Sequence, residues 1–198
     1  MSFVLGLTGS IGMGKSTAAG MFRELGHPVW DADAAVHRLY AKGGAAVAKV
    51  ASAFPGVWKQ GAIDRAALKS ALAQDPSGFS RLEAIVHPLV AGDRDAFLRR
   101  YADAPIVVLD IPLLYENGTE SQMDGVAVVS ASLDIQRARV LSRPGMTEAA
   151  FQLILARQMP DAEKRARADW VIPSETLEDA RAAIMDICRE IMAGRPHA

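Results

Sequence analysis

Cysteine is nearly absent from this sequence, since Cys188 is the only one in 198 residues. A single thiol excludes a disulfide within the chain and any metal site built from several cysteines. Long apolar runs are also missing: half of the residues are hydrophobic, yet no uninterrupted run approaches the roughly 18 residues that cross a membrane. The chain opens directly on its first apolar strand, without a basic leader or cleavage site. These absences predict a cytoplasmic protein with no membrane partner.

A basic excess is missing as well. The formal net charge is -1, which argues against a nucleic-acid partner because proteins that bind nucleic acids usually carry a surplus of Lys and Arg. The charge is uneven along the chain, however. Residues 137–167 hold seven basic and three acidic side chains, a local balance of +4.

The most informative motif lies within residues 3–17. An apolar run at 3–7 predicts a strand that is buried on both faces, and residues 17–25 have the pattern of a helix. Between them stands Gly9-x-x-x-x-Gly14-Lys15-Ser16, the pattern of a P-loop in its proper context. We therefore expect the nucleotide to contact Gly9, Ser10, Ile11, Gly12, Met13, Gly14, Lys15, Ser16 and Thr17.

The residue types of this motif follow from the chemistry of phosphate. A phosphate chain can nest against consecutive backbone N–H groups only where no Cβ intervenes, and glycine also tolerates positive φ. The N-terminus of the following helix favours an anion. Lys15 adds a positive charge for the β- and γ-phosphates, and the hydroxyl of Ser16 is a suitable Mg²⁺ ligand. ATP and Mg²⁺ are the expected cofactors.

The remaining pattern alternates strands with helices. Apolar runs at 106–110 and 125–129 predict further buried strands, and residues 170–172 predict a last short strand. Residues 34–103, in contrast, show a helical pattern with little strand signal and form an insertion. Within it, His87-Pro88 should break or kink a helix. We expect an α/β fold with a doubly wound parallel sheet, and a ligand site at the carboxyl ends of its strands.

A P-loop leaves open what happens to the bound nucleotide. A GTPase needs an Asn-Lys-x-Asp guanine reader, but the only asparagine is Asn117 and Gly118 follows it. A mechanical or DNA-dependent ATPase usually has an acidic residue directly after its Walker-B aspartate, whereas Ile111 follows Asp110. A small-molecule kinase needs an acceptor pocket, a base and mobile arginines. The helical insertion, the Asp31/Asp33 pair and the arginine-rich stretch are candidates for these.

Several motifs, in order along nearly the whole chain, resemble those of the dephospho-CoA kinase family. They are the P-loop, Asp31-Ala-Asp33, Ile85-Val-His-Pro88, Asp110-Ile-Pro-Leu-Leu-Tyr-Glu116, Arg143, Arg157-Gln158 and Ala168-Asp169. The resemblance implies a fold like that of nucleoside-monophosphate kinases, with a helical acceptor-binding insertion at 34–103 and an arginine-rich lid at 137–167. It also implies that ATP phosphorylates the 3′-hydroxyl of the dephospho-CoA ribose. Pro173-Ser174 departs from the family, which usually has an asparagine near the adenine.

The resemblance assigns roles to individual residues. It places the catalytic base at Asp33, beside Asp31, although a helix N-cap is the alternative for Asp33. It makes Pro112, Leu113, Leu114 and Glu116 contacts of the acceptor, where ordinary loop packing is the alternative, above all for the two leucines. Asp110 is a further site residue that could hold Mg²⁺ through water or orient the acceptor loop. His87 is a further candidate for the substrate phosphates, and a structural hydrogen bond is its alternative.

Arginines of the lid are the last group of candidates. Planar, always-charged guanidinium groups suit phosphate oxygens, which favours Arg143, also as a catalytic residue, and Arg157. We expect the other arginines of the stretch to lie on a solvated helix face: Arg137, Arg139, Arg165 and Arg167. Two alternative functions stay open at this point, a P-loop kinase for another small metabolite and a nucleotide-binding regulator without kinase activity.

Overall fold

The computed structural model describes residues 2–75 and 77–194. The chain divides into two compact units. Unit 1 comprises the described residues up to Trp30 and from Tyr101 onward, and unit 2 is Asp31–Arg100. Each unit has its own hydrophobic core.

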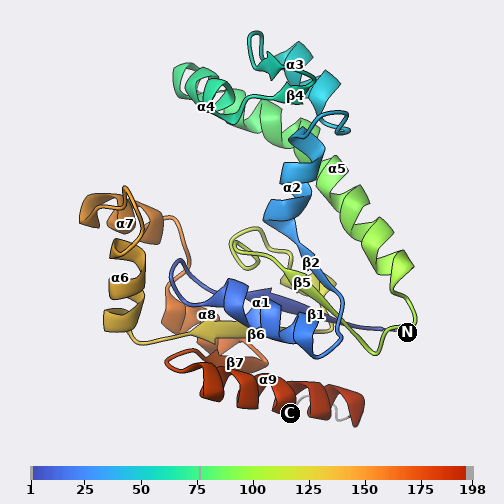
Figure 1. Ribbon diagram of the computed structural model, residues 1–198, viewed down its shortest axis with the longest axis vertical. Coiled ribbons are helices and arrows are strands. Elements are labelled where there is room, and N and C mark those ends of the chain that lie inside the picture. Colours follow the sequence, from blue (N-terminus) through green and yellow to red (C-terminus); the bar gives the residue numbers. More distant parts are fainter. Residues whose placement is uncertain (1, 76, 195–198) are drawn as a thin grey trace. The chain divides into compact units, whose positions relative to one another are not determined.

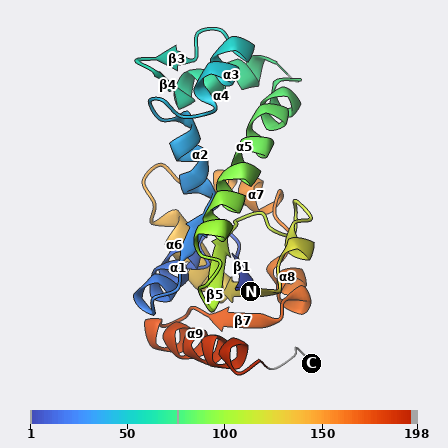
Figure 2. The ribbon, with the colours of Figure 1, turned by 90° about the vertical axis from the view of Figure 1, so that its right-hand side faces the viewer.

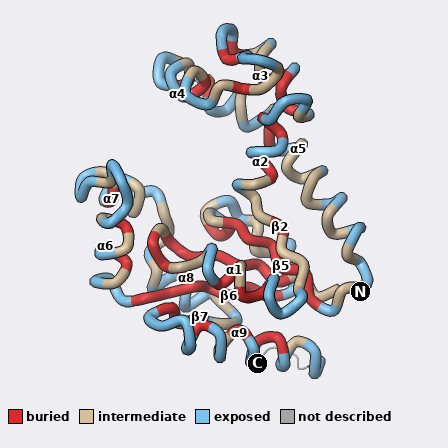
Figure 3. Tube along the Cα trace, viewed as in Figure 1, coloured by how far each residue is buried: buried red, intermediate tan, exposed pale blue. Residues whose placement is uncertain are grey.

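Unit 1 is built on a five-stranded sheet with the order β2-β5-β1-β6-β7 (Figure 1). The strands are β1 (Phe3–Thr8), β2 (Val29–Asp31), β5 (Ile106–Asp110), β6 (Gly125–Ser130) and β7 (Trp170–Pro173). β1 pairs in parallel with both β5 and β6, and β6 pairs in parallel with β7. Every residue of β5 and β6 is buried, as Figure 3 shows, which explains why these strands are continuous apolar runs without alternation.

The helices of unit 1 are α1 (Lys15–Glu24), α6 (Leu133–Leu141), α7 (Glu148–Leu155), α8 (Asp161–Arg167) and α9 (Leu177–Met192), with a short 3₁₀ turn, η1 (Glu120–Gln122), before β6. Of these, α1, α8 and α9 contact strands of the sheet, and α6 contacts α7. Phe22 of α1 and Ile184 of α9 are fully buried in one core with Leu5 and Leu7 of β1. α9 lies alongside β7 in both views (Figure 2), and α8 contacts β6.

Unit 2 is mainly helical. It contains α2 (Ala32–Tyr40), α3 (Val47–Ala53), β3 (Trp58–Lys59), β4 (Ala62–Ile63), α4 (Arg65–Gln74) and α5 (Gly78–Arg100). Leu39, Val50 and Phe54 are buried together in its core. The β3–β4 hairpin was not predicted from the sequence. Its two-residue turn has positive φ at both Gln60 (52°) and Gly61 (87°), as the common tight hairpin turns require.

Of the predicted break or kink at His87-Pro88, the break is wrong, because α5 continues through Pro88. Proline removes one backbone donor from a helix interior and usually bends it. Here the apolar residues on both sides of the proline, among them Val86 and Leu89, pack against the core of unit 2. That burial outweighs the local cost. No helix among the described residues is long and apolar enough to cross a membrane.

The strand order places the expected ligand site. Connections from β1 run to β2 on one side of the sheet, and the chain later crosses to β6 and β7 on the other side. A ligand of a doubly wound sheet binds at the carboxyl ends of the strands, near the point where the order reverses. Gly9 follows the end of β1 and Asp110 ends β5, so both lie at that edge. The doubly wound α/β fold is thereby confirmed.

Candidate active site

The P-loop joins the end of β1 to the first residue of α1 and has little room for side chains. Gly12 and Gly14 have φ of 79° and 89°, in the left-handed region that favours glycine. A Cβ on Gly9 would approach the Val129 carbonyl oxygen to 2.7 Å, and one on Gly12 would approach Val140 Cγ2 to 2.5 Å. The glycines are therefore required by both backbone conformation and close packing.

The N-terminus of α1 is prepared for an anion. Gly14 is its N-cap, and among the described residues no side chain caps it; its first turn also contains no acidic residue. Uncapped N–H groups at a helix start leave donors available, and the helix dipole favours negative charge there. Ser16 and Thr17 are both exposed in this first turn, so their hydroxyls are accessible.

Lys15 and Asp110 form an ion pair at the carboxyl edge of the sheet, between Nζ and Oδ1. The strand register sets this meeting, because Asp110 lies opposite Leu7 of β1. The side chain of Asp110 is only 3% exposed and that of Lys15 is 15% exposed. The positive charge of the P-loop is thus held against a buried carboxylate in the structure.

The backbone of the P-loop is held by side chains that the sequence did not single out. Gln136 Nε2 of α6 donates to the carbonyl of Ile11 at 2.8 Å, and the N–H of Ile11 donates to Gln158 Oε1 at 3.0 Å. The hydroxyl of Ser174, just after β7, donates to the carbonyl of Met13 at 2.6 Å. Gln158 belongs to a motif quoted above, but no local pattern points to Gln136 or Ser174.

Arg139 does not lie on a solvated helix face, so that expectation is wrong. Its guanidinium donates to Ser174 twice, from Nη1 to the hydroxyl at 3.2 Å and from Nη2 to the carbonyl at 2.6 Å. The other three arginines that we expected on such a face form salt bridges: Arg137 with Glu148, Arg165 with Asp161, and Arg167 with Glu120.

The two predicted lid arginines are exposed. Arg143 follows α6 at the turn that precedes α7, and Arg157 follows α7. Within the described chain, neither guanidinium forms a hydrogen bond or an ion pair. Both remain available to an anionic ligand.

The loop after β5 carries the predicted acceptor contacts, and its residues differ in exposure. Leu114 is fully buried, and a Cβ on Gly6 would approach its Cδ1 to 2.8 Å, so Leu114 belongs to the core of unit 1. Leu113 is exposed, whereas the carbonyl of Pro112 accepts a hydrogen bond from the Thr8 hydroxyl at 3.1 Å. Among the predicted acceptor contacts, Leu113 is therefore the exposed one.

Glu116 is tied to α8. Its Oε1 lies 2.8 Å from Nζ of Lys164, whose side chain is fully buried, and also accepts the N–H of Met159 at 2.8 Å. Burial raises the pKa of the Glu116 carboxyl, but the hydrogen bonds from Lys164 and Met159 outweigh it and hold that pKa below its usual value. Nearby, burial raises the pKa of Tyr115 to about 12.

Replacing Lys164 with methionine should destabilise the protein by about 3 kcal/mol, because breaking a buried ion pair leaves Glu116 charged without its partner. Urea unfolding at pH 7 measures this, with the exposed Lys69→Met of α4 as the control. The loss should shrink as the pH falls, since protonation removes the orphan charge of Glu116. The double variant Glu116→Gln/Lys164→Met should regain part of the loss; equal stability of Lys164→Met and Lys69→Met would refute the role of the pair.

In unit 2, the structure separates the two aspartates of the Asp31-Ala-Asp33 motif. Asp31 ends β2 and is the N-cap of α2, where its Oδ1 accepts the N–H of Ala34 at 2.9 Å. Asp33 lies in the first turn and is exposed, and no hydrogen bond of its side chain is found within the described residues. The cap that was the alternative for Asp33 therefore belongs to Asp31. His87 is exposed on α5.

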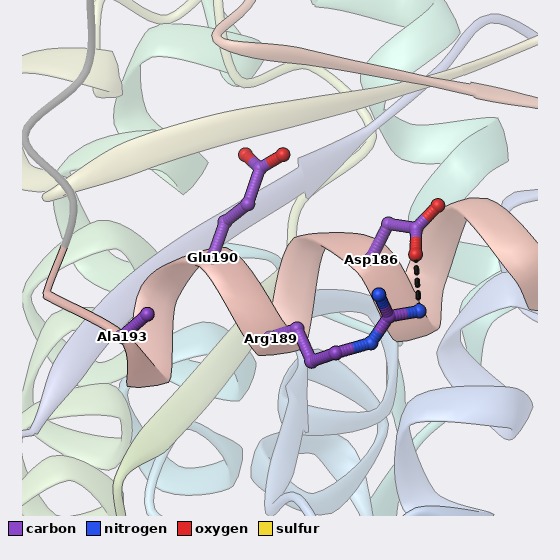
Figure 4. A pocket seen from close by; sticks show the side chains of 4 residues that line it. All are labelled: Asp186, Arg189, Glu190 and Ala193. Atoms are coloured by element: carbon purple, nitrogen blue, oxygen red, sulfur yellow. Dashed lines mark hydrogen bonds and ion pairs between the residues drawn. The ribbon is translucent and has the colours of Figure 1, made fainter.

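Two hollows of unit 1 lie outside the P-loop. Ser130, Ser132, Asp161, Arg165 and Glu175 contribute to one of about 470 Å³, where Asp161 accepts from the Ser130 hydroxyl at 2.8 Å. The other runs along the end of α9, and the described residues that line it come from there: Asp186, Arg189, Glu190 and Ala193. Figure 4 shows Asp186 and Arg189 pointing toward one another and Glu190 pointing away from them. None of the described residues that line either hollow belongs to the P-loop.

A comparison with known proteins agrees with the motifs. A family model described as dephospho-CoA kinase matches residues 3–179. The chain is 57% identical to a curated dephospho-CoA kinase of Ruegeria pomeroyi over the full length of both, and 60% identical to one of Cereibacter sphaeroides over 96% of this chain and 95% of the relative. The solved structure of TT1252 from Thermus thermophilus matches with a TM-score of 0.84, 34% identity and 98% coverage of both chains. The chain belongs to the dephospho-CoA kinase family.

Proposed function

We propose that this chain transfers the γ-phosphoryl group of ATP to the 3′-hydroxyl of the dephospho-CoA ribose, which yields ADP and coenzyme A. The observation that carries the proposal is the full-length identity of 57% to a relative named for this activity. The P-loop and its Lys15–Asp110 pair support the proposal, because a P-loop and its lysine bind the phosphates of the nucleotide that donates the phosphoryl group. The nucleotide contacts are those of residues 9–17.

The reaction needs a proton acceptor, and Asp33 is the residue we propose. As the ribose 3′-oxygen bonds to the γ-phosphorus, the bond from that phosphorus to the β,γ-bridging oxygen breaks, and ADP leaves. The 3′-hydroxyl proton passes to the Asp33 carboxylate. An exposed aspartate whose side chain forms no hydrogen bond or ion pair within the described residues suits this task, whereas Asp31 is occupied by its cap on α2. Asp31 contributes to substrate binding by fixing the start of that helix.

The lid arginines and the helical insertion complete the proposal. Arg143 and Arg157 bind the phosphate oxygens, Arg143 during the transfer itself, and residues 137–167 act as the lid. Residues 34–103 bind the acceptor, with His87 near its phosphates. Leu113 and Pro112 line the acceptor side of the loop after β5; Asp110, Leu114 and Glu116 support that loop from its buried side.

Mg²⁺ fits the residues present. Ser16 offers an accessible hydroxyl at the first turn of α1, and Asp110 lies at the adjacent strand end. Within the described part of the chain, no group of three His, Cys, Asp or Glu side chains forms a metal cage. This agrees with the usual binding of Mg²⁺ through few protein groups, phosphates and water. When bound, the ion would neutralise charge on the phosphates; Ser16 is the ligand we propose.

Replacing Ser16 with alanine should raise the Mg²⁺ concentration for half-maximal activity roughly tenfold or more, because the hydroxyl ligand is lost. A Mg²⁺ titration of the initial rate at fixed ATP measures this. Ser77→Ala, which removes a hydroxyl bonded to Asp75 in unit 2, is the control. Superimposable titrations of Ser16→Ala and wild type would remove Ser16 from the metal site.

Cys188 bears on the compartment that we propose, which is the cytoplasm. It is a free thiol buried on α9, and burial raises its pKa to about 11. Such a thiol is a packing group and not a reactive one. A protein whose single cysteine stays reduced suits a reducing compartment.

An acceptor panel tests the function. ATP consumption by the purified protein should be rapid with dephospho-CoA and near background with adenosine, shikimate, gluconate and uridine. Turnover of one of these, with dephospho-CoA inert, would make the chain a kinase of another metabolite. ATP binding without phosphorylation of any acceptor would favour a regulator.

A further inference from the structure

Two carbonyl groups of the P-loop accept hydrogen bonds from side chains outside it. Gln136 donates to Ile11 and Ser174 donates to Met13. Ile11 and Met13 each precede a glycine with positive φ, namely Gly12 and Gly14. All of these residues belong to unit 1.

The position of these bonds matters because the peptide group is planar. In a trans peptide, the C=O of one residue and the N–H of the next point in opposite directions. No cis peptide occurs among the described residues. Pinning the Met13 carbonyl toward Ser174 therefore turns the Gly14 N–H the opposite way, and pinning the Ile11 carbonyl toward Gln136 does the same for the Gly12 N–H.

These hydrogen bonds are needed because glycine can adopt many backbone conformations. A peptide followed by glycine can rotate at little steric cost, and rotation would turn its N–H away from a bound phosphate. Gln136 is 2% exposed and Ser174 is 8% exposed, so neither donor has ready access to water as an alternative partner. Loss of either bond would also leave a buried polar group unsatisfied.

Arg139 fixes the direction of the Ser174 hydroxyl. Guanidinium can only donate and a carbonyl can only accept, so the hydroxyl must accept from Arg139 and donate to Met13. The donor charge polarises the hydroxyl and strengthens its bond to the carbonyl. Met13 is held further at its side chain, where Sδ accepts the N–H of Ala131 at 3.1 Å.

We propose that Ser174 and Gln136 are positioning residues for the triphosphate: they lock the two P-loop peptides whose N–H groups, on Gly12 and Gly14, bind phosphate. The proposal rests on the proposed use of the P-loop for ATP. Ser174 stands where the sequence departs from the family pattern near the adenine. The proposal gives it a role in binding the phosphates and not in binding the adenine.

Binding measurements without any acceptor test this. Ser174→Ala should raise the dissociation constant of ATP about three- to tenfold, because this is the change that one neutral hydrogen bond is worth. The dissociation constant of inorganic tripolyphosphate should rise by the same factor. Gln136→Met, which removes the other donor, should do likewise. Ser2→Ala is the matched control, because its hydroxyl also donates to backbone carbonyls, those of Tyr101 and Ala102, but lies just before the start of β1 and not at its P-loop end. Thermal unfolding shows which variants are folded.

The outcomes separate the roles. Weaker binding of both ligands by a folded variant supports the proposal. Weaker binding of ATP with unchanged binding of tripolyphosphate would overturn it, since Ser174 would then act on the nucleoside. Unchanged affinity for both ligands in Ser174→Ala would overturn it as well. If wild-type protein bound neither ligand, the proposed function of the P-loop would fail, which is a different result.

Discussion

Asp33→Asn should lower kcat with dephospho-CoA by roughly 10²- to 10⁴-fold while ATP affinity stays unchanged. This is the usual contribution of a positioned proton acceptor, and an amide cannot take up the ribose proton. Stability should hardly change, because Asp33 is exposed and the cap of α2 belongs to Asp31. Initial rates at saturating ATP, together with calorimetric ATP binding, measure both parts.

Asp31→Asn is the matched control for that experiment. Asparagine caps helices about as well as aspartate, so this variant should keep its stability and most of its turnover. A near-normal kcat in Asp33→Asn would reject the base assignment. A large loss in Asp31→Asn with normal Asp33→Asn would move the base to Asp31.

Lys15→Met should reduce turnover by roughly 10³-fold or more, since the charge that meets the β- and γ-phosphates is lost where water is excluded. The structure adds a second effect. Asp110 is only 3% exposed and loses its ion-pair partner, so this variant should also be less stable. Steady-state kinetics and urea unfolding report the two effects separately.

The double variant Lys15→Met/Asp110→Asn distinguishes the role of Lys15 in phosphoryl transfer from its role in protein stability. It also removes the negative charge of Asp110 that Lys15 no longer balances, so it should regain stability, but turnover should remain lost. Recovery of turnover in the double variant would mean that Lys15 serves only to neutralise Asp110. Wild-type kcat in Lys15→Met would reject any role of Lys15 in transfer.

Local patterns were sufficient for the elements that carry the site. A continuous apolar run predicts a strand buried on both faces, and β1, β5 and β6 are such strands. Side-chain caps are also local: Asp64 accepts from the N–H groups of Ala66 and Ala67, and Thr176 accepts from the N–H of Asp179. The glycine spacing of the P-loop is set by backbone geometry and so is visible in the sequence.

Partners that are distant in the sequence were not predictable in this way. Arg139 and Ser174 are 35 residues apart, and Ser174 and Met13 are 161 apart. Nothing in a helix pattern shows which arginine of α6 meets a strand end. The burial of Lys164 was not predictable for the same reason: its local sequence is typical of a surface charge, but its side chain is fully buried against Glu116. The helix break at Pro88 was predicted wrongly because packing of α5 in the core outweighs the preference of proline to end a helix.

The central claim concerns one bond, between the γ-phosphorus of ATP and the ribose 3′-oxygen. The most direct test incubates the protein with Mg²⁺, dephospho-CoA and ATP labelled in its γ-phosphoryl group, and then identifies the labelled product by mass spectrometry and ³¹P NMR. The account predicts a single labelled product that is coenzyme A, phosphorylated on the 3′-oxygen. Label on any other oxygen, or no label on dephospho-CoA, would contradict it.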